Sequence, residues 1–482
     1  MINCLPRRTS ALLLRDSAFK RLFTGRICSY QPFHPGRQRI VLKVAYDISN
    51  LAADFGRSDA ITGINRVVLE VLDRICKRDD LQVTAVALAG DDPLDDCTKA
   101  SLYLDNKKPP VACGFEYTFD PGRSLTSAYK AVFRATQSAT RSPASFARPR
   151  SLTRRYLRSA LHRLAYYHRR LFPTGVFDRR TFDVFHCPHW KVPSDLTGSV
   201  PRVFTVYDLI PLVRPDFVPQ SLSDAFRRLL HRIDVERDWV ISISEFTRTE
   251  FCERTGMSPE RVRVAPLAAA ACFYPVTDPE VITATRARYA IPEGEYLLCL
   301  AAPQPRKNLA SLIRSFFRLL DEERLHDTSL VLAGSPGQGW MYDEIFAAAE
   351  TSSKHRSRVV STGYVAEEDL AALYSGAVAF VFPSLYEGFG LPALEAMACG
   401  TPVITSNTTS LPEVVGDAAL LVDPSDADQL CEAMSIILSH HSLREVLSRR
   451  GLERAAQFSW ERCADQTVEV YRLAAGKSGI EP

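Results

Sequence analysis

The sequence lacks the features that mark membrane-spanning, disulfide-rich and nucleic-acid-binding proteins. None of its apolar runs, such as YLLCLAAP at 296–303, approaches the ~20 residues that a spanning helix needs. The twelve cysteines are scattered and form no CxxC pair, which argues against a disulfide framework or a zinc site and favours reduced thiols. A net charge of only +3 gives no bulk attraction for nucleic acid, so we expect no nucleic-acid partner. The 482 residues exceed one ordinary core and, with 46% hydrophobic residues, indicate a globular protein of two domains.

Residues 1–39 differ in composition from the rest of the chain. They carry eight Arg or Lys residues and a single acid, Asp16. They contain no long apolar segment, which argues against a secretion signal, and the Arg-rich, acid-poor composition resembles an organelle transit peptide. A basic disordered tail, or a start codon assigned too early, is the alternative that composition leaves open.

Strands and helices alternate from residue 40 onward. An apolar, β-branched strand is expected at 40–49, an amphipathic helix at 62–75 and a second strand at 81–88. This βαβ order predicts an α/β fold with a parallel sheet covered by helices. An insert of weak pattern, about 90–180, interrupts it.

The alternation resumes after the insert and supports two doubly wound domains. A first domain is expected over 40–285, a linker at 275–292, a second domain over 290–457 and a last helix within 458–475 that could cross back to the first. Further segments with strand or strand–helix patterns are 182–188, 202–212, 238–251, 261–267, 295–301, 309–320, 329–334, 358–364, 377–382, 401–406 and 419–424. In such sheets ligands bind at the carboxyl ends of the strands, so we expect the site in a cleft between the domains.

The insert contains a basic segment at 141–180 with eleven arginines and one acid, Asp178. Four leucines repeat there at helical spacing with arginines around them: Leu157, Leu161, Leu164 and Leu171. Such a helix can contact an anionic membrane surface. A solvated helix that packs its leucines on the domain core is the other interpretation.

The segment 383–402, PSLYEGFGLPALEAMACGTP, carries the strongest functional signal. The apolar run at 377–382 leads into a turn with Gly388 and Gly390, and a helix-like segment follows. Strand, glycine turn and helix start form the arrangement that directs free backbone N–H groups at a phosphate.

Two glutamates, Glu387 and Glu395, flank this turn. Carboxylates are poor phosphate ligands, so we expect them to bind hydroxyls of sugars attached to the phosphate. The pattern therefore predicts a nucleotide sugar. If the helix begins at Pro392, Glu395 lies in its first turn. There it could have a purely structural role, because an acid in the first turn stabilises the helix dipole. This alternative does not explain Glu387.

Two cations, Arg306 and Lys307, follow the first strand of the second domain in the motif PRKN. Arginine offers a planar fork for phosphate oxygens and lysine a point charge, so together they can stabilise a leaving diphosphate without a metal. A solvated loop is the alternative when the pair is considered alone.

Two other motifs are weak candidates for a metal site. Asp426 and Asp428 imitate a DxD motif, but they follow Pro424 at an apparent helix start, so helix capping is favoured. His186 and His189 are three residues apart, and we expect structural histidines or a cleft wall there. We predict no metal.

The glutamates at 387 and 395, with EGFGLPALEAMACGTPVI, resemble the large family of retaining glycosyltransferases called group 1, or family four. The similarity is dense in the second half, spans about 200–475 and extends loosely to TGINR at 62–66. Other motifs that carry it are PRKN (305–308), TGY (362–364), SLPEVVGDAALLVDP (410–424), FSWERCA (458–464) and VYDLIPLVRPDF (206–217).

The resemblance implies a GT-B fold of two Rossmann-like domains with the active site in the cleft between them. It implies that Arg306 and Lys307 contact the donor diphosphate. By the same likeness Glu387 would contact hydroxyls of the transferred sugar, and Glu395 the ribose.

Further donor contacts are implied at less distinctive positions. Gly63, in the loop after the first strand, would let the first half approach the diphosphate, and Val365 lies where the base is held. Backbone contacts to sugar and phosphate are implied for Gly388, Phe389, Gly390 and Leu391.

The chain departs from the family at Tyr207-Asp208, where many members have His-Asp. With a reference pKa of ~10, Tyr207 cannot replace an imidazole base and would be a hydrogen-bonding wall. Family reactions are explained by front-face attack, in which the leaving phosphate accepts the proton, so the missing histidine does not exclude activity.

We therefore predict a metal-independent, retaining glycosyltransferase that moves a hexose, mannose favoured, from a GDP- or UDP-linked donor to a saccharide or lipid-linked acceptor in surface polysaccharide synthesis. No cofactor is expected. The expected location is cytoplasmic, with peripheral contact at the inner face of the membrane through 141–180. A GT-B nucleotide-sugar epimerase and a non-catalytic, membrane-associated sugar-nucleotide-binding protein remain the alternatives.

Overall fold

The structure is a computed structural model, and it describes residues 41–49, 51, 63–87, 114–117, 181–189, 200–300, 304–322, 324, 325, 327–334 and 353–476. The basic leader at 1–39 and the Arg-rich segment 141–180 lie outside the described residues, as does most of the insert. Within the described part, no helix combines the length and apolar character needed to cross a membrane.

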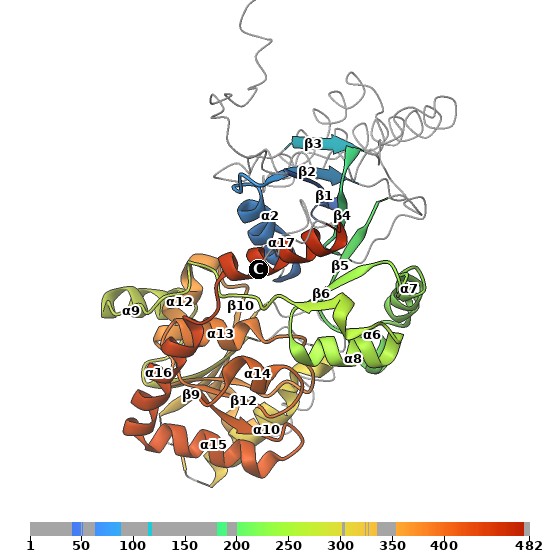
Figure 1. Ribbon diagram of the computed structural model, residues 1–482. Helices are drawn as coiled ribbons and strands as arrows, with labels where there is room; N and C mark the ends of the chain where they lie inside the picture. The colour runs from blue at the N-terminus through green and yellow to red at the C-terminus, as the bar shows by residue number, and fades with distance from the viewer. Residues whose placement is uncertain are drawn as a thin grey trace, which may run out of the picture. The chain divides into compact units, whose positions relative to one another are not determined.

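The first half is built on a seven-stranded sheet in the order β3-β2-β1-β4-β5-β6-β7 (Figure 1), and every strand pair is parallel. Strands such as β4, with each residue buried, are covered on both faces because helices lie on both sides of a parallel sheet. The strands are β1 (Leu42–Asp47), β2 (Leu81–Ala87), β3 (Gly114–Tyr117), β4 (Val184–Cys187), β5 (Arg202–Val206), β6 (Trp239–Ser242) and β7 (Val262–Val264).

Local sequence signals explain the helices of this half. In α8, for example, Ser244 caps the start by accepting a hydrogen bond from the Thr247 N–H, and Gly256 ends it in the left-handed conformation. The described helices are α2 (Gly63–Ile75), α6 (Ile210–Val213), α7 (Gln220–Leu230) and α8 (Glu245–Thr255), with 3-10 turns η2 (Pro215–Phe217) and η3 (Pro259–Arg261).

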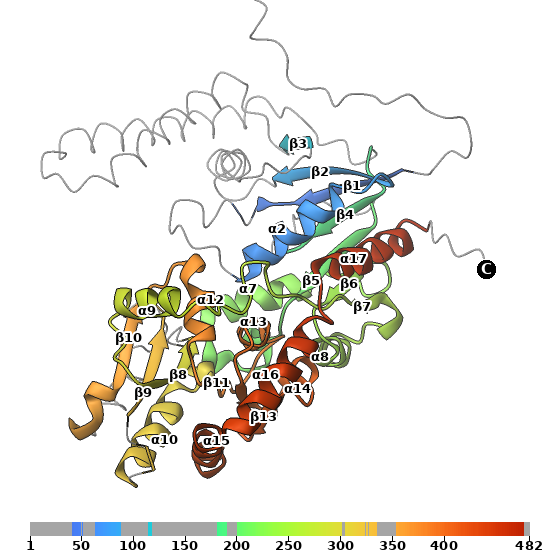
Figure 2. The ribbon, with the colours of Figure 1, turned by 90° about the vertical axis from the view of Figure 1, so that its left-hand side faces the viewer.

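The second half is built on a six-stranded parallel sheet in the order β10-β9-β8-β11-β12-β13. Figure 2 shows β10, β9, β8 and β11 of this sheet. Its strands are β8 (Glu295–Leu300), β9 (Thr328–Ala333), β10 (Val359–Gly363), β11 (Ala379–Phe382), β12 (Val403–Ser406) and β13 (Ala419–Val422). Its helices are α10 (Leu309–Asp321), α12 (Glu367–Ser375), α13 (Leu391–Ala398), α14 (Leu411–Val415), α15 (Ala427–Ser439) and α16 (His441–Ala455), with 3-10 turns η4 (Pro305–Lys307) and η5 (Ser353–Arg358).

Two Rossmann-like sheets confirm the predicted α/β class. In the second sheet the strand order reverses between β8 and β11, and at such a point the loops at the carboxyl ends of neighbouring strands diverge and leave room for a ligand.

The segment 275–292, which the sequence indicated as a linker, contains helix α9 (Pro279–Arg288). Asp278 caps this helix, and Pro279 is its first residue. Its apolar residues are spread around the helix, so hydrophobic periodicity gave no signal. The Tyr289 hydroxyl after α9 donates to Asp369 of α12 at 2.7 Å, which joins the helix to the second half.

The last helix, α17 (Trp460–Ala474), packs on α2 and on the first sheet although it follows the second half in sequence. Arg74 of α2 donates to Glu461 across 2.8 Å. Inside the core, Tyr471 and His186 share a hydrogen bond of 2.6 Å, and both residues are fully buried.

Candidate active site

The loops after β8 and β11 meet at one edge of the second sheet because the two strands are parallel neighbours. The loop after β8 ends in η4, which carries Arg306 and Lys307. The loop after β11 is the glycine turn that contains Glu387. The Leu385 N–H donates to the Arg306 carbonyl oxygen at 2.7 Å, so the backbones of the two loops are tied together.

Both cations bind the same carboxylate oxygen. Nη1 of Arg306 lies 2.6 Å and Nζ of Lys307 2.8 Å from Oε1 of Glu387. Glu387 and Lys307 are only 8% and 7% exposed. Three of the residues that the sequence singled out, Arg306, Lys307 and Glu387, thus lie in direct contact.

Burial and charge set the protonation of this cluster. Burial alone would raise the pKa of Glu387, but the charges of Arg306 and Lys307 overcome it and lower the pKa to about 2. Burial and the neighbouring Arg306 lower the pKa of Lys307 to about 8, against the opposing pull of Glu387. At neutral pH the Glu387 carboxylate therefore accepts hydrogen bonds and donates none, and Lys307 is mostly protonated.

Gly388 is the contact point between the glycine turn and the first half. A Cβ built on it would lie 1.9 Å from the carbonyl oxygen of Tyr207, so no other residue fits without movement. The Gly388 carbonyl oxygen accepts hydrogen bonds from Ser244 Oγ at 2.8 Å and Thr247 Oγ1 at 3.3 Å. The start of α8 is thus fixed against the turn.

Helix α13 begins at Leu391, after Gly390, which has φ +112°. Glu395 is therefore the fifth residue of the helix, and the expected first-turn position from a start at Pro392 is wrong. Its buried carboxylate accepts from Arg66 Nη1 at 3.1 Å and from the Tyr374 hydroxyl at 3.3 Å. Burial raises its pKa and Arg66 opposes the rise.

Tyr207 and Asp208 directly follow β5 and lie beside Gly388. The buried Tyr207 hydroxyl donates to the Pro188 carbonyl oxygen at 2.8 Å, and burial raises its pKa well above 10. Asp208 accepts from the Ile210 N–H at 3.0 Å. Burial raises the pKa of Asp208 to about 6, against the nearby charge of Arg306.

The other predicted donor residues lie in different settings. Gly63 is the exposed first residue of α2, not part of a loop, and among the described residues no atom lies within 4 Å of a Cβ built on it. Val365 and Phe389 are 7% and 3% exposed and pack in apolar clusters, and Leu391 is half-buried. Because the Val365 and Phe389 side chains are buried, these two residues offer a ligand mainly their backbone.

Comparison with known proteins decides the family. The profile described as "Glycosyl transferases group 1" matches residues 281–454, and "Glycosyltransferase Family 4" matches residues 61–268. The O-antigen chain mannosyltransferase B of Escherichia coli is 35% identical over 290 residues, which cover 60% of this chain and 74% of that protein. The chain belongs to the group 1, family 4 glycosyltransferases.

Two further comparisons bear on length and fold. The serotype-specific mannosyltransferase WbdA of Escherichia coli is 34% identical over 288 residues, but the match spans only 34% of its length. A glycosyltransferase structure from Rickettsia africae ESF-5 superposes with a TM-score of 0.60 at 13% identity, covering 91% of this chain and 100% of that one. Together with the other matched structures, this shows the GT-B fold.

Sequence reasoning missed several residues of this glycosyltransferase that join its halves. Arg66 lies inside the quoted motif TGINR, yet its partner Glu395 is 329 positions away. The Glu413 carboxylate accepts the N–H groups of Glu245 and Phe246 at 2.9 and 3.2 Å, so α14 of the second half caps α8 of the first. The conspicuous Glu in SLPEVV was the available signal.

The weak metal candidates have structural roles. Asp426 caps α15 by accepting the N–H groups of Asp428 and Gln429, as expected. His186 is buried between Tyr471 and Thr205 Oγ1, 2.9 Å from the latter, and burial lowers its pKa to about 3. Within the described ranges, no group of three or more His, Cys, Asp or Glu residues is placed to hold a metal.

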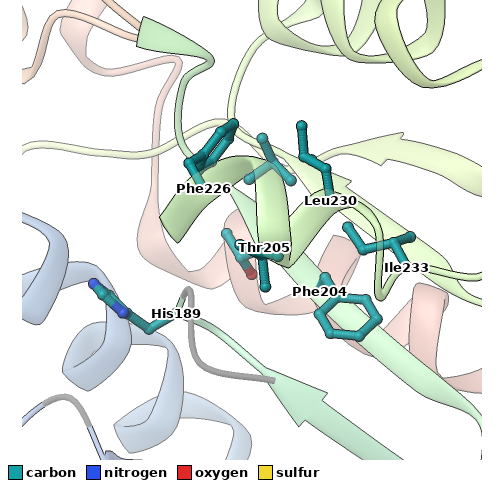
Figure 3. Close-up of a pocket in the computed structure, with 8 residues that line it drawn as sticks. His189, Phe204, Thr205, Phe226, Leu230 and Ile233 are labelled. Atoms are coloured by element: carbon teal, nitrogen blue, oxygen red, sulfur yellow. The ribbon is translucent and has the colours of Figure 1, made fainter. Parts of the chain in front are cut away.

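Two described pockets lie outside the cluster around Glu387. Figure 3 shows a small pocket of about 10 Å³, beside β5 and α7, with His189 on its wall. It is lined by His189, Phe204, Thr205, Val206, Phe226, Leu229, Leu230 and Ile233. A wider pocket of about 630 Å³ includes Arg202 and Trp239, which begin β5 and β6, so it lies at the opposite edge of the first sheet from Tyr207.

Proposed function

We propose that this glycosyltransferase transfers a hexose, with mannose the favoured sugar, from a nucleotide sugar to a hydroxyl of a surface polysaccharide or a lipid-linked oligosaccharide. The observation that carries the proposal is Glu387, ionised and buried between Arg306 and Lys307 beside the glycine turn. Mannose is favoured because the O-antigen chain mannosyltransferase B and WbdA are among the similar proteins.

The charges of the cluster suit departure of a nucleoside diphosphate. As the bond between the sugar C1 and the phosphate oxygen breaks, negative charge grows on the diphosphate. Arg306 and Lys307, fixed and largely removed from water, would stabilise that charge without reorganisation. We infer that these two cations supply the stabilisation that other enzymes obtain from a metal ion.

Glu387 suits recognition of the transferred sugar. With its pKa lowered to about 2, Glu387 is ionised at neutral pH, which suits a hydrogen-bond acceptor better than a general acid. It can accept hydrogen bonds from sugar hydroxyls and hold the ring over the cations.

We propose retention by front-face attack. The acceptor oxygen bonds to C1 on the face from which the phosphate leaves, and the departing phosphate oxygen takes the acceptor proton. Tyr207 is no candidate base, because its raised pKa and its hydrogen bond to Pro188 keep the hydroxyl protonated. Asp208, with a pKa of about 6 and the charge of Arg306 nearby, would accept a hydrogen bond from a hydroxyl of the donor sugar.

Product analysis tests the proposal. Purified protein is incubated with GDP-mannose and with UDP-hexoses, in EDTA, with lipid-linked oligosaccharide as acceptor. We expect a glycosylated acceptor whose new linkage keeps the donor's anomeric configuration by NMR. Free sugar without acceptor would indicate an epimerase, and saturable donor binding without turnover would indicate a binding protein; neither is favoured by the glycosyltransferase relatives.

We also propose cytoplasmic location with peripheral membrane contact, on the sequence of 141–180. Flotation with vesicles of anionic and of neutral lipid tests it. Binding to anionic vesicles alone, lost on replacing the arginines of this segment by glutamine, is the expected result. Equal flotation of the wild-type protein and of the glutamine variant with anionic vesicles would refute the proposed membrane contact.

A further inference from the structure

Arg66 bridges two carboxylates that belong to the other half of the chain. It lies in the first turn of α2, and its Nη2 donates to Glu367 Oε1 at 2.7 Å while Nη1 donates to Glu395 Oε1 at 3.1 Å. The guanidinium carbon lies 5.6 Å from the centre of the Phe273 ring, and the side chain is 13% exposed. The ion pair of Arg66 with Glu395 is thus largely buried, unlike the exposed surface pairs that contribute little.

Glu395 needs such a partner because it is a buried carboxylate in the middle of α13. It is 6% exposed, and its second oxygen has the Tyr374 hydroxyl at 3.3 Å. An uncompensated charge at this depth would be strongly unfavourable. The charged and titratable groups that act on it are Arg66 of α2, Glu367 and Tyr374 of α12, Lys307 of η4, Cys399 after α13 and Cys272 before α9.

We propose that Arg66 is a positioning residue for donor recognition, which fixes the Glu395 carboxylate so that it can accept the ribose hydroxyls of a nucleoside diphosphate sugar. This inference rests on the proposed function and on the ribose contact that the family resemblance implies for Glu395. Donor recognition by the second half then depends on a side chain supplied by the first.

If Arg66 has this role, donor affinity should depend on pH in a variant that lacks it. Burial raises the pKa of Glu395, and Arg66 is the largest influence that opposes the rise. A carboxylate offers acceptors to both ribose hydroxyls, whereas a protonated carboxyl offers fewer. Without Arg66 the pKa of Glu395 rises further, so donor affinity falls as pH is lowered through a range in which the wild-type protein still has an ionised Glu395.

The test uses Arg66→Met, which keeps the apolar stem and removes the charge, together with Arg66→Lys, which restores a charge. The matched control is Arg74→Met, on the same helix, where the ion pairs are with Glu70 and Glu461. Binding of GDP and UDP and the KM of the donor are measured from pH 6 to pH 8.5, with the melting temperature of each variant.

We expect Arg66→Met to weaken donor binding about 10- to 100-fold at pH 7, the range set by one hydrogen bond to a charged group. The loss is larger at pH 6 than at pH 8.5, Arg66→Lys recovers part of it, and Arg74→Met binds as the wild type does. In a Glu395→Gln background, Arg66→Met adds little further loss, because the two residues act through one contact.

Three results would overturn the inference: wild-type affinity in Arg66→Met, a loss of equal size at every pH, or the same loss in Arg74→Met. Failure of the proposed function is distinguishable, because it would show in the wild-type protein itself, as no binding of GDP or UDP or as binding without transfer to an acceptor, whatever the Arg66 variants do.

Discussion

A side-chain carbon added to Gly388 would lie 1.9 Å from the backbone carbonyl oxygen of Tyr207. Gly388 lies in the turn after β11 and Tyr207 directly follows β5, so segments that follow strands of two different sheets touch at this glycine. The neighbouring Glu387 is held by the cations of η4. One contact between the halves and the ion pairs of the candidate site therefore involve two adjacent residues, Gly388 and Glu387.

Gly388→Ala should disrupt this contact. The obstacle is backbone, which cannot rotate away, so we expect a stability loss of about 1–3 kcal/mol from overpacking. Displacement of Glu387 by about 1 Å would lower transfer roughly 100-fold. Thermal melts and steady-state rates measure both. Gly63→Ala is the control for stability, since no described atom lies within 4 Å of its Cβ; an equal loss of melting temperature in both variants would contradict the steric argument.

Removing either side of the buried ion pair should stop transfer without unfolding the protein. We expect Lys307→Met and Glu387→Gln each to lower kcat about 100- to 1,000-fold, as loss of one group that stabilises developing charge does. Arg318→Met, which removes exposed pairs on α10, serves as the control and should retain wild-type rates. Circular dichroism checks the fold, and near-normal kcat in both site variants would count against the assignment.

The value of kcat/KM should decline at alkaline pH. Lys307 has a pKa of about 8, so its charge is present below that pH and is lost as pH rises through it. Glu387, with a pKa of about 2, stays ionised throughout. We expect kcat/KM to decline above about pH 8, and Lys307→Arg to remove this decline because arginine does not titrate there. The same decline in Lys307→Arg would assign it to another group.

The hydrogen bond between Tyr471 and His186 should stabilise the docking of α17. Tyr471→Phe leaves a buried ring nitrogen of His186 without this partner, which costs about 1–3 kcal/mol. Urea unfolding, compared at constant m-value, measures the change. Tyr274→Phe, at a position 57% exposed, should leave the midpoint unchanged. Equal midpoints for both variants would mean that the bond does not contribute.

Strands and the meeting of Arg306, Lys307 and Glu387 were predictable because they depend on local patterns. Continuous apolar runs such as β8 and β11 mark buried parallel strands, and residues that follow such strands gather at one sheet edge. Glu387 stood out because no local structural role explained an acid before two glycines.

Contacts between distant segments could not be predicted in the same way. The partner of Arg66 depends on how two sheets face each other, which no spacing within 62–66 encodes. Helix α9 has no apolar stripe, so only its Asp-Pro start indicated it. The start of α13 was misplaced because Pro392 is favoured at a helix's first positions, whereas Gly390 ends the turn one residue earlier than assumed.

The most direct test is a calorimetric titration, in which GDP and UDP are added to the wild-type protein and to Lys307→Met. We expect one of these diphosphates to bind the wild-type protein saturably. We expect at least ~100-fold weaker binding by the variant, because the diphosphate loses the buried charge of Lys307. Equal affinity in the two proteins, or no binding of either diphosphate by the wild type, would contradict this expectation.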